Sequence, residues 1–175
     1  AFDRNEDLTM LENGMLWKTH PDKAVTFVAN HDTEVNEYED NMIASENKMK
    51  AYSYILTHPG YPTIFYQDYN NPDFQEEIDQ LILIHNSIAT GSAEILYADK
   101  DQYIMRRNGT DGNPGLILYL SLNGNKRFTV DTNWNSRKVM DYTHNTDYTA
   151  QTTSNGLVTI ESSSEGYAIY SIMEE

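Results

Sequence analysis

The sequence predicts an α/β arrangement followed by an antiparallel all-β arrangement. Residues 24–89 alternate between short apolar runs and longer segments of helical periodicity, in the order strand, helix, strand, helix, which is typical of two βα units of a parallel sheet. Residues 92–175 instead contain short strand-like runs separated by Asn-Gly and Asp-Gly dipeptides, which favour the positive φ angles of tight hairpin turns. We therefore place a domain boundary near residue 90, between an α/β part at residues 1–90 and an antiparallel β part at residues 91–175.

Polar residues follow directly on the first predicted strand. Residues 1–19 predict a loop and one short helix, and residues 24–29 form an almost continuous apolar run, as in a strand buried on both faces. Asn30, His31 and Asp32 come next, at the carboxyl end of that strand. This end is where α/β barrels carry their chemistry, although Asn and Asp are also common turn formers. Taken alone, these three residues favour an ordinary turn.

The next elements complete the α/β pattern. A helix is predicted over residues 42–57, where apolar side chains recur at helical spacing until a Pro-Gly pair ends the helix. Residues 61–66 are aromatic and β-branched and predict the second strand. A second helix begins at Pro72, with Asn71 as its cap and a clear apolar stripe behind it.

The β part predicts an antiparallel sheet or sandwich of about 80 residues. We expect residues 92–175 to fold without the helical part, because they carry their own strands and turns. The predicted strands span residues 94–97, 102–107, 115–122, 128–130, 138–141, 157–160 and 167–172.

Composition narrows the class of partner. The 12 basic and 27 acidic side chains give a net charge of −15, which argues against nucleic acid or an anionic membrane as the main partner but does not repel a neutral sugar. There is no cysteine, so disulfides and thiolate chemistry are excluded. A chain without cysteine suits an export route, and we expect an extracellular location, although no signal peptide opens this sequence.

The phrase Phe27-Val-Ala-Asn-His-Asp32 resembles the last signature block of the α-amylase superfamily of glycoside hydrolases. Residues 51–66 are similar to the seventh helix and eighth strand of that family's barrel, and residues 81–85 to its eighth helix. Residues 92–175 look like the β domain that follows the barrel, called domain C. The similarity is closest to archaeal and plant-like α-amylases. It implies the last two βα units of a (β/α)8 TIM barrel, from strand 7 to helix 8, followed by domain C.

The resemblance also implies roles for particular residues. It makes Asp32 the third acidic residue of the family's site, a transition-state stabiliser, and gives His31 a contact to the sugar. Asn30 belongs to the same substrate-binding set and is expected to shape the turn that presents the other two. Tyr66 and Asp68 follow the second strand and are further candidates for the sugar groove. The alternatives are a satisfied strand-end histidine for His31, and packing or loop solvation for Tyr66 and Asp68.

Two carboxylates that the resemblance implies are missing. Retaining glycosidases need a carboxylate nucleophile and a carboxylic acid, and neither the family's Gly-x-Arg-x-Asp block nor its acid/base Glu is found. We therefore expect this chain to be part of an endo-acting α-amylase that hydrolyses internal α-1,4 bonds of starch or glycogen, complemented by an N-terminal barrel polypeptide and inactive alone. The alternative is a non-catalytic amylase-like module that binds glucan or stabilises a partner.

No metal site is predicted within the chain. The run Asp68-x-Asn70-x-x-Asp73 faintly resembles a calcium loop but lacks its glycine, so a loop and helix cap is the better interpretation. The resemblance implies calcium in the complete enzyme, held mainly outside this chain. Four further histidines show no ligand spacing, namely His20, His58, His85 and His144.

Overall fold

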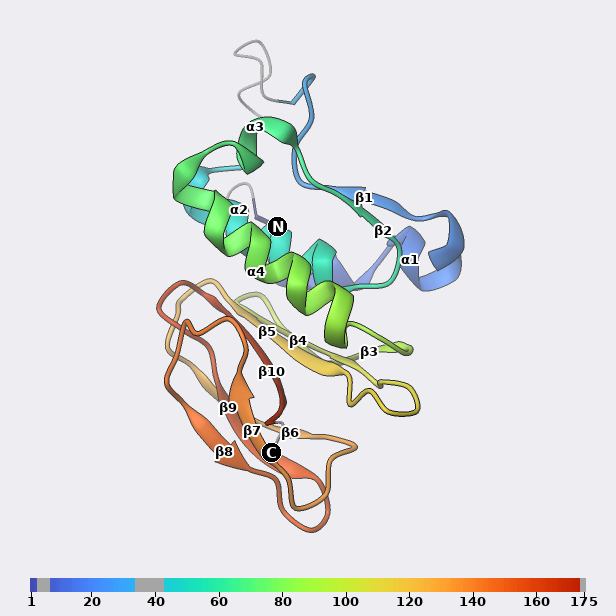
Figure 1. Ribbon diagram of the computed structural model, residues 1–175, viewed down its shortest axis with the longest axis vertical. Coiled ribbons are helices and arrows are strands. Elements are labelled where there is room, and N and C mark those ends of the chain that lie inside the picture. The colour runs from blue at the N-terminus through green and yellow to red at the C-terminus, as the bar shows by residue number, and fades with distance from the viewer. Residues whose placement is uncertain (3–6, 34–42, 174–175) are drawn as a thin grey trace.

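Two long helices lie between a short pair of parallel strands and a β-sandwich (Figure 1). The computed structural model describes residues 1–2, 7–33 and 43–173. No helix among these residues is both long enough and apolar enough to cross a membrane. The α/β part comprises the 3-10 helix η1 (Leu8–Glu12), α1 (Leu16–Thr19), the 3-10 helix η2 (Pro21–Lys23), β1 (Val25–Phe27), α2 (Ser45–Thr57), β2 (Tyr61–Thr63), α3 (Tyr66–Tyr69) and α4 (Pro72–Ile88).

The first strand pair is parallel, as predicted, and in register from Val25 opposite Tyr61 to Phe27 opposite Thr63. The amide of Tyr61 donates to the Ala24 carbonyl at 2.7 Å, which starts the pairing. Gly60 precedes it with φ +128°, and a Cβ there would lie 2.7 Å from the same carbonyl oxygen, so only glycine lets the two backbones approach.

Burial of both faces of the first strand was predicted and is wrong for the described residues. Val25 is 64% exposed and Phe27 is 51% exposed. The second strand is also shorter than predicted, since Tyr66 opens α3. Helix α2 begins at Ser45, while the predicted first residue, Met42, lies outside the described residues. Helix α4 begins as predicted, with Pro72 first and the Asn71 side chain accepting from the Asp73 amide.

The β part forms a six-stranded antiparallel sheet in the order β3-β4-β5-β10-β7-β8, faced by the antiparallel pair β6-β9. Seven of its strands match predicted runs, and the short β8 was not predicted. The bounds are β3 (Ala93–Ala98), β4 (Gln102–Arg107), β5 (Leu116–Ser121), β6 (Arg127–Asp131), β7 (Lys138–Asp141), β8 (Thr149–Gln151), β9 (Leu157–Glu161) and β10 (Tyr167–Ile172).

The central strand β5 is buried along its whole length and separates two cores. Its even-numbered residues, from Leu116 to Leu120, join the core shared with α2 and α4. Ile117 and Tyr119 point to the opposite face and join the core between the two sheets. The alternation follows from the two-residue period of a strand.

Polar contacts also cross the predicted boundary at residue 90. The Arg107 guanidinium donates to the Thr57 carbonyl, and the Tyr167 hydroxyl donates to Glu77. The α/β and β parts therefore share a core and a set of hydrogen bonds. This arrangement disagrees with our expectation that residues 92–175 fold alone, because one face of their sheet is covered by helices.

A piece spanning residues 91–175 is expected to lack cooperative unfolding. Removing the helices would expose a continuous apolar sheet face, which favours association over a unique fold. The measurement is urea unfolding followed by far-UV circular dichroism, with the whole chain as control. A sharp, reversible transition of the piece alone would contradict the shared-core interpretation. The uncovered face would include Tyr103, Met105, Leu116, Leu118, Leu120 and Ile169.

His58, at the end of α2, is buried in this junction. Its Nδ1 bonds the Tyr54 carbonyl at 2.7 Å, its Nε2 accepts from the Tyr103 hydroxyl at 2.8 Å, and its ring stacks on Tyr54. Both ring nitrogens are thus satisfied in the neutral form. Burial lowers the pKa of His58 to about 3, and the nearby charges of Arg107 and Lys18 act in the same direction.

His58 should make the fold sensitive to acid. Its pKa is near 6.5 when unfolded and about 3 when folded, so its contribution is complete above pH 6.5 and is lost at about 1.4 kcal/mol per pH unit as pH falls toward 3. In His58→Gln this dependence disappears. The difference in unfolding free energy between wild type and variant, from urea titrations, should shrink by about 2 kcal/mol between pH 7 and 5. A constant difference would contradict the assignment.

Candidate functional site

The residues after β1 form a tight, self-bonded turn. The Asn30 side-chain oxygen accepts from the amides of Asp32 at 2.8 Å and Thr33 at 3.1 Å. In return, the Thr33 hydroxyl accepts from the Asn30 amide at 2.9 Å and donates to the Asn30 carbonyl at 3.1 Å. Asn30 thus shapes the turn, as we expected from its type. Its side-chain oxygen is occupied by backbone amides rather than left open to a ligand.

His31 and Asp32 project from this turn into solvent. Their side chains are 87% and 79% exposed, and the His31 Nε2 lies 3.3 Å from the Asp32 Oδ1. A carboxylate accepts hydrogen bonds from hydroxyls, and an imidazole N–H donates to them. The pair can therefore hold a polyhydroxylated ligand, with Asp32 as acceptor and His31 as donor.

Tyr66 and Asp68 differ from each other in placement. Tyr66 opens α3 and is 74% exposed, so its ring is available to a ligand. Asp68 is only 4% exposed, and its carboxylate accepts from the Lys48 ammonium at 2.5 Å and the Tyr52 hydroxyl at 2.7 Å. Asp68 therefore anchors α3 to α2 and does not present its oxygens to a groove.

The roles of two residues in this region were not predicted from the sequence. Thr33 closes the turn, and the Asn-x-x-Thr spacing, which places a second short polar side chain three residues after Asn30, was the available signal. Lys48 is buried on its helix as the ion-pair partner of Asp68. Helical periodicity gives no indication of that partner.

The described residues do not supply the carboxylate nucleophile and the acid/base carboxyl group that a retaining glycosidase needs beside Asp32. The described residues also contain no group of three His, Cys, Asp or Glu side chains able to hold a metal ion. No catalytic step is assigned to the calcium that the resemblance implies.

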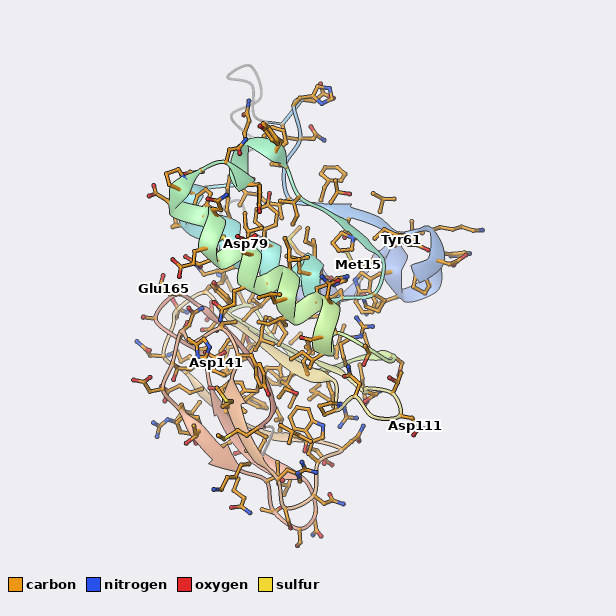
Figure 2. All side chains as sticks on the ribbon, viewed as in Figure 1. Met15, Tyr61, Asp79, Asp111, Asp141 and Glu165 are labelled. Carbon is orange, nitrogen blue, oxygen red and sulfur yellow. The ribbon has the colours of Figure 1, made fainter. Side chains whose placement is uncertain are left out.

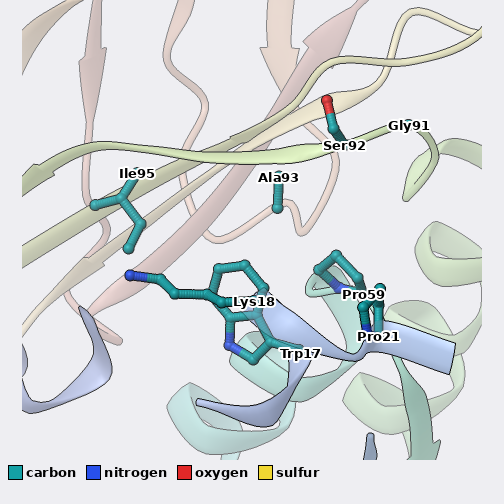
Figure 3. A pocket seen from close by; sticks show the side chains of 8 residues that line it. All are labelled: Trp17, Lys18, Pro21, Pro59, Gly91, Ser92, Ala93 and Ile95. Atoms are coloured by element: carbon teal, nitrogen blue, oxygen red, sulfur yellow. The ribbon is translucent and has the colours of Figure 1, made fainter. Parts of the chain in front are cut away.

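The described residues also form a cavity at the junction of the two parts, away from the predicted site (Figure 3). It measures about 450 Å³, and none of the predicted site residues lines it. Its wall combines the Trp17 indole and the Lys18 stem with Pro21, Pro59 and β3.

The turn geometry predicts different costs for two substitutions in the chain. Asn30→Ala removes the acceptor of two backbone amides and should lower the unfolding free energy by about 1 kcal/mol. Asp32→Asn changes an exposed side chain and should alter it by less than about 0.5 kcal/mol. Urea titrations of both variants beside wild type provide the measurement. Equal costs would show that Asn30 is not the residue that shapes the turn.

Comparison with known proteins identifies the relatives. Residues 116–171 match the family model described as Alpha-amylase C-terminal. The cytoplasmic alpha-amylase of Escherichia coli (strain K12) is 26% identical over 190 residues, which cover 98% of this chain and 38% of that protein. The alpha-amylase type B isozyme of Hordeum vulgare is 39% identical over 92 residues, 51% of this chain and 60% of that protein. The chain thus spans less than two thirds of either relative.

Solved structures of the same class share the fold. The alpha-amylase from Geobacillus thermoleovorans, complexed with acarbose, superposes with a TM-score of 0.69 at 16% identity, covering 99% of this chain and 45% of that one. The Anoxybacillus alpha-amylase gives a TM-score of 0.72 at 16% identity, over 99% of this chain and 44% of the other. Residues 116–171 thus match the alpha-amylase C-terminal family, and the chain as a whole has alpha-amylases as relatives.

Proposed function

We propose that this chain is the C-terminal part of an endo-acting α-amylase that hydrolyses internal α-1,4 bonds of starch or glycogen with retention. The observation that carries the proposal is the exposed His31–Asp32 pair, held by the Asn30–Thr33 turn at the carboxyl end of a parallel strand pair. The relationship to alpha-amylases supports the same substrate class. In this interpretation, residues 1–90 belong to a catalytic TIM barrel and residues 91–175 form domain C.

In the proposed mechanism, Asp32 binds the sugar at the cleavage point without bonding to it covalently. Its carboxylate accepts charge-assisted hydrogen bonds from sugar hydroxyls, and these bonds strengthen as the ring flattens toward an oxocarbenium-like state. His31 donates to a hydroxyl of the same sugar. The nucleophile and the acid/base group come from chain segments other than the described residues.

The uncovered face of the strand pair supports an N-terminal barrel polypeptide as partner. Val25, Phe27 and Tyr61 expose apolar surface there, and Figure 2 labels Tyr61 on the side of the helices away from the sandwich. A parallel pair is stable only inside a larger sheet with covered faces. We infer that further barrel strands cover this face, on the same polypeptide or on another.

The second candidate function is a non-catalytic amylase-like module that binds glucan or stabilises a partner. It is favoured by one observation, that of the two predicted site carboxylates only Asp32 is exposed, while Asp68 is buried. Detection of glucan binding without hydrolysis in the complete assembly would select it.

The extracellular location stays a prediction.

Asp32→Asn in the complete enzyme, in which this chain is joined to its N-terminal barrel, should lower kcat on soluble starch by about a hundredfold or more. Asn keeps the shape but removes the charge that strengthens in the transition state, so KM should change less. Asp22→Asn, an exposed aspartate of η2, is the matched control and should leave kcat unchanged. Near-native kcat in Asp32→Asn would overturn the proposed role.

The chain alone should release no maltooligosaccharides from starch, because it lacks the nucleophile and the acid/base group.

A further inference from the structure

Helix α3 is a single turn of four residues, and its position depends on contacts to its neighbours. Such a short helix is not stable by itself. Asp68, in its third position, is bonded by Lys48 and Tyr52, two residues that lie one helical turn apart on α2. On the exposed side, the Tyr69 hydroxyl donates to Asp79 of α4 at 2.9 Å. Helix α3 is therefore held from both long helices.

The ion pair between Lys48 and Asp68 is buried, with both side chains less than 10% exposed. A buried ion pair adds little net stability, because the cost of removing both charges from water offsets their attraction. Its consequence here is geometric. The carboxylate reaches the ammonium and the phenol together only if α3 keeps its place and rotation on α2. The Tyr52 hydroxyl also accepts from the Phe65 amide at 3.4 Å, which ties down the residue before α3.

The residue placed by this arrangement is Tyr66. It begins α3 and has its ring in solvent, whereas Asp68, two positions later, points into the protein. The register of the parallel pair puts Phe27 opposite Thr63, so Asn30 and Tyr66 each lie three residues beyond the same rung. The Asn30–Thr33 turn and Tyr66 therefore both follow the carboxyl ends of the two strands. Figure 1 shows α3 at that end. An aromatic ring at the same end of the strands as a hydroxyl-binding pair suits the apolar face of a glucose ring.

We propose that Lys48, Tyr52 and Asp68 are positioning residues that hold Tyr66 as the aromatic platform of a glucan subsite beside His31 and Asp32. The inference rests on the proposed function for its ligand class. It goes beyond that function by naming the residue that contacts the sugar and the buried group that orients it.

The test uses maltoheptaose titrated into the full 175-residue chain and followed by the backbone amide signals. The expected result is a shift of the signals of Asn30–Thr33 and of Tyr66–Tyr69. Tyr66→Ala should weaken binding about tenfold, and Tyr61→Ala, an exposed tyrosine at the other end of β2, should not. Shifts at Asn30–Thr33 without any at Tyr66 would overturn this inference and leave the proposed function standing. No shift at either place would also overturn this inference, whereas the proposed function is tested separately by the kcat of Asp32→Asn in the complete enzyme.

The positioning role is tested by Asp68→Asn, Lys48→Met and the double variant. Each single substitution leaves a buried charge unpaired and should destabilise the fold, whereas the double variant restores neutrality and should recover much of the stability. The proposal expects that the double variant still binds maltoheptaose about tenfold more weakly and exchanges the amide hydrogens of residues 65–70 faster, with α4 unchanged. Recovery of binding together with stability would show that the group is only structural and would overturn the positioning role.

Discussion

The burial of both faces of the six-stranded sheet is the constraint on which the rest of this structure depends. The alternating side chains of β5 make one face of the sheet part of the helical core and the other face part of the sandwich core. Helices α2 and α4 lie on that sheet, and the parallel pair lies on the helices. The turn after β1 and the short helix after β2 therefore take their positions from a domain that carries none of the predicted site residues.

The candidate site is built by two kinds of interaction with different ranges. Asn30 and Thr33 bond each other's backbone over three residues, so the presentation of His31 and Asp32 is a local property of the chain. The placement of Tyr66 instead depends on a carboxylate that reaches across to α2, twenty residues earlier in the sequence. The turn at Asn30 depends on contacts between near neighbours in the sequence. The placement of Tyr66 depends on the packing of α3 against α2.

The strand pair exposes apolar side chains on one face. The side chains of Val25 and Phe27 are exposed to solvent, although the apolar composition of their strand is typical of a buried strand. Burying such side chains is worth about 1.5–3 kcal/mol each, so a covering segment would gain substantially from docking there. The cytoplasmic alpha-amylase of Escherichia coli is longer than this chain, because the match covers 98% of this chain but only 38% of that protein.

The sequence by itself determined the features that depend on near neighbours. Periodicity and turn dipeptides located the two strands and two long helices of the α/β part, the cap at Asn71 and seven of the β strands, because each is decided within a few residues. The Asn-His-Asp phrase predicts the site through its resemblance, and that assignment stays a prediction. Only the tertiary structure decided that Asp68 is an internal anchor, that Lys48 is its partner, and that the two predicted domains share a core. These outcomes depend on which side chains meet when the helices settle on the sheet, and such long-range contacts leave no periodic signal in the chain.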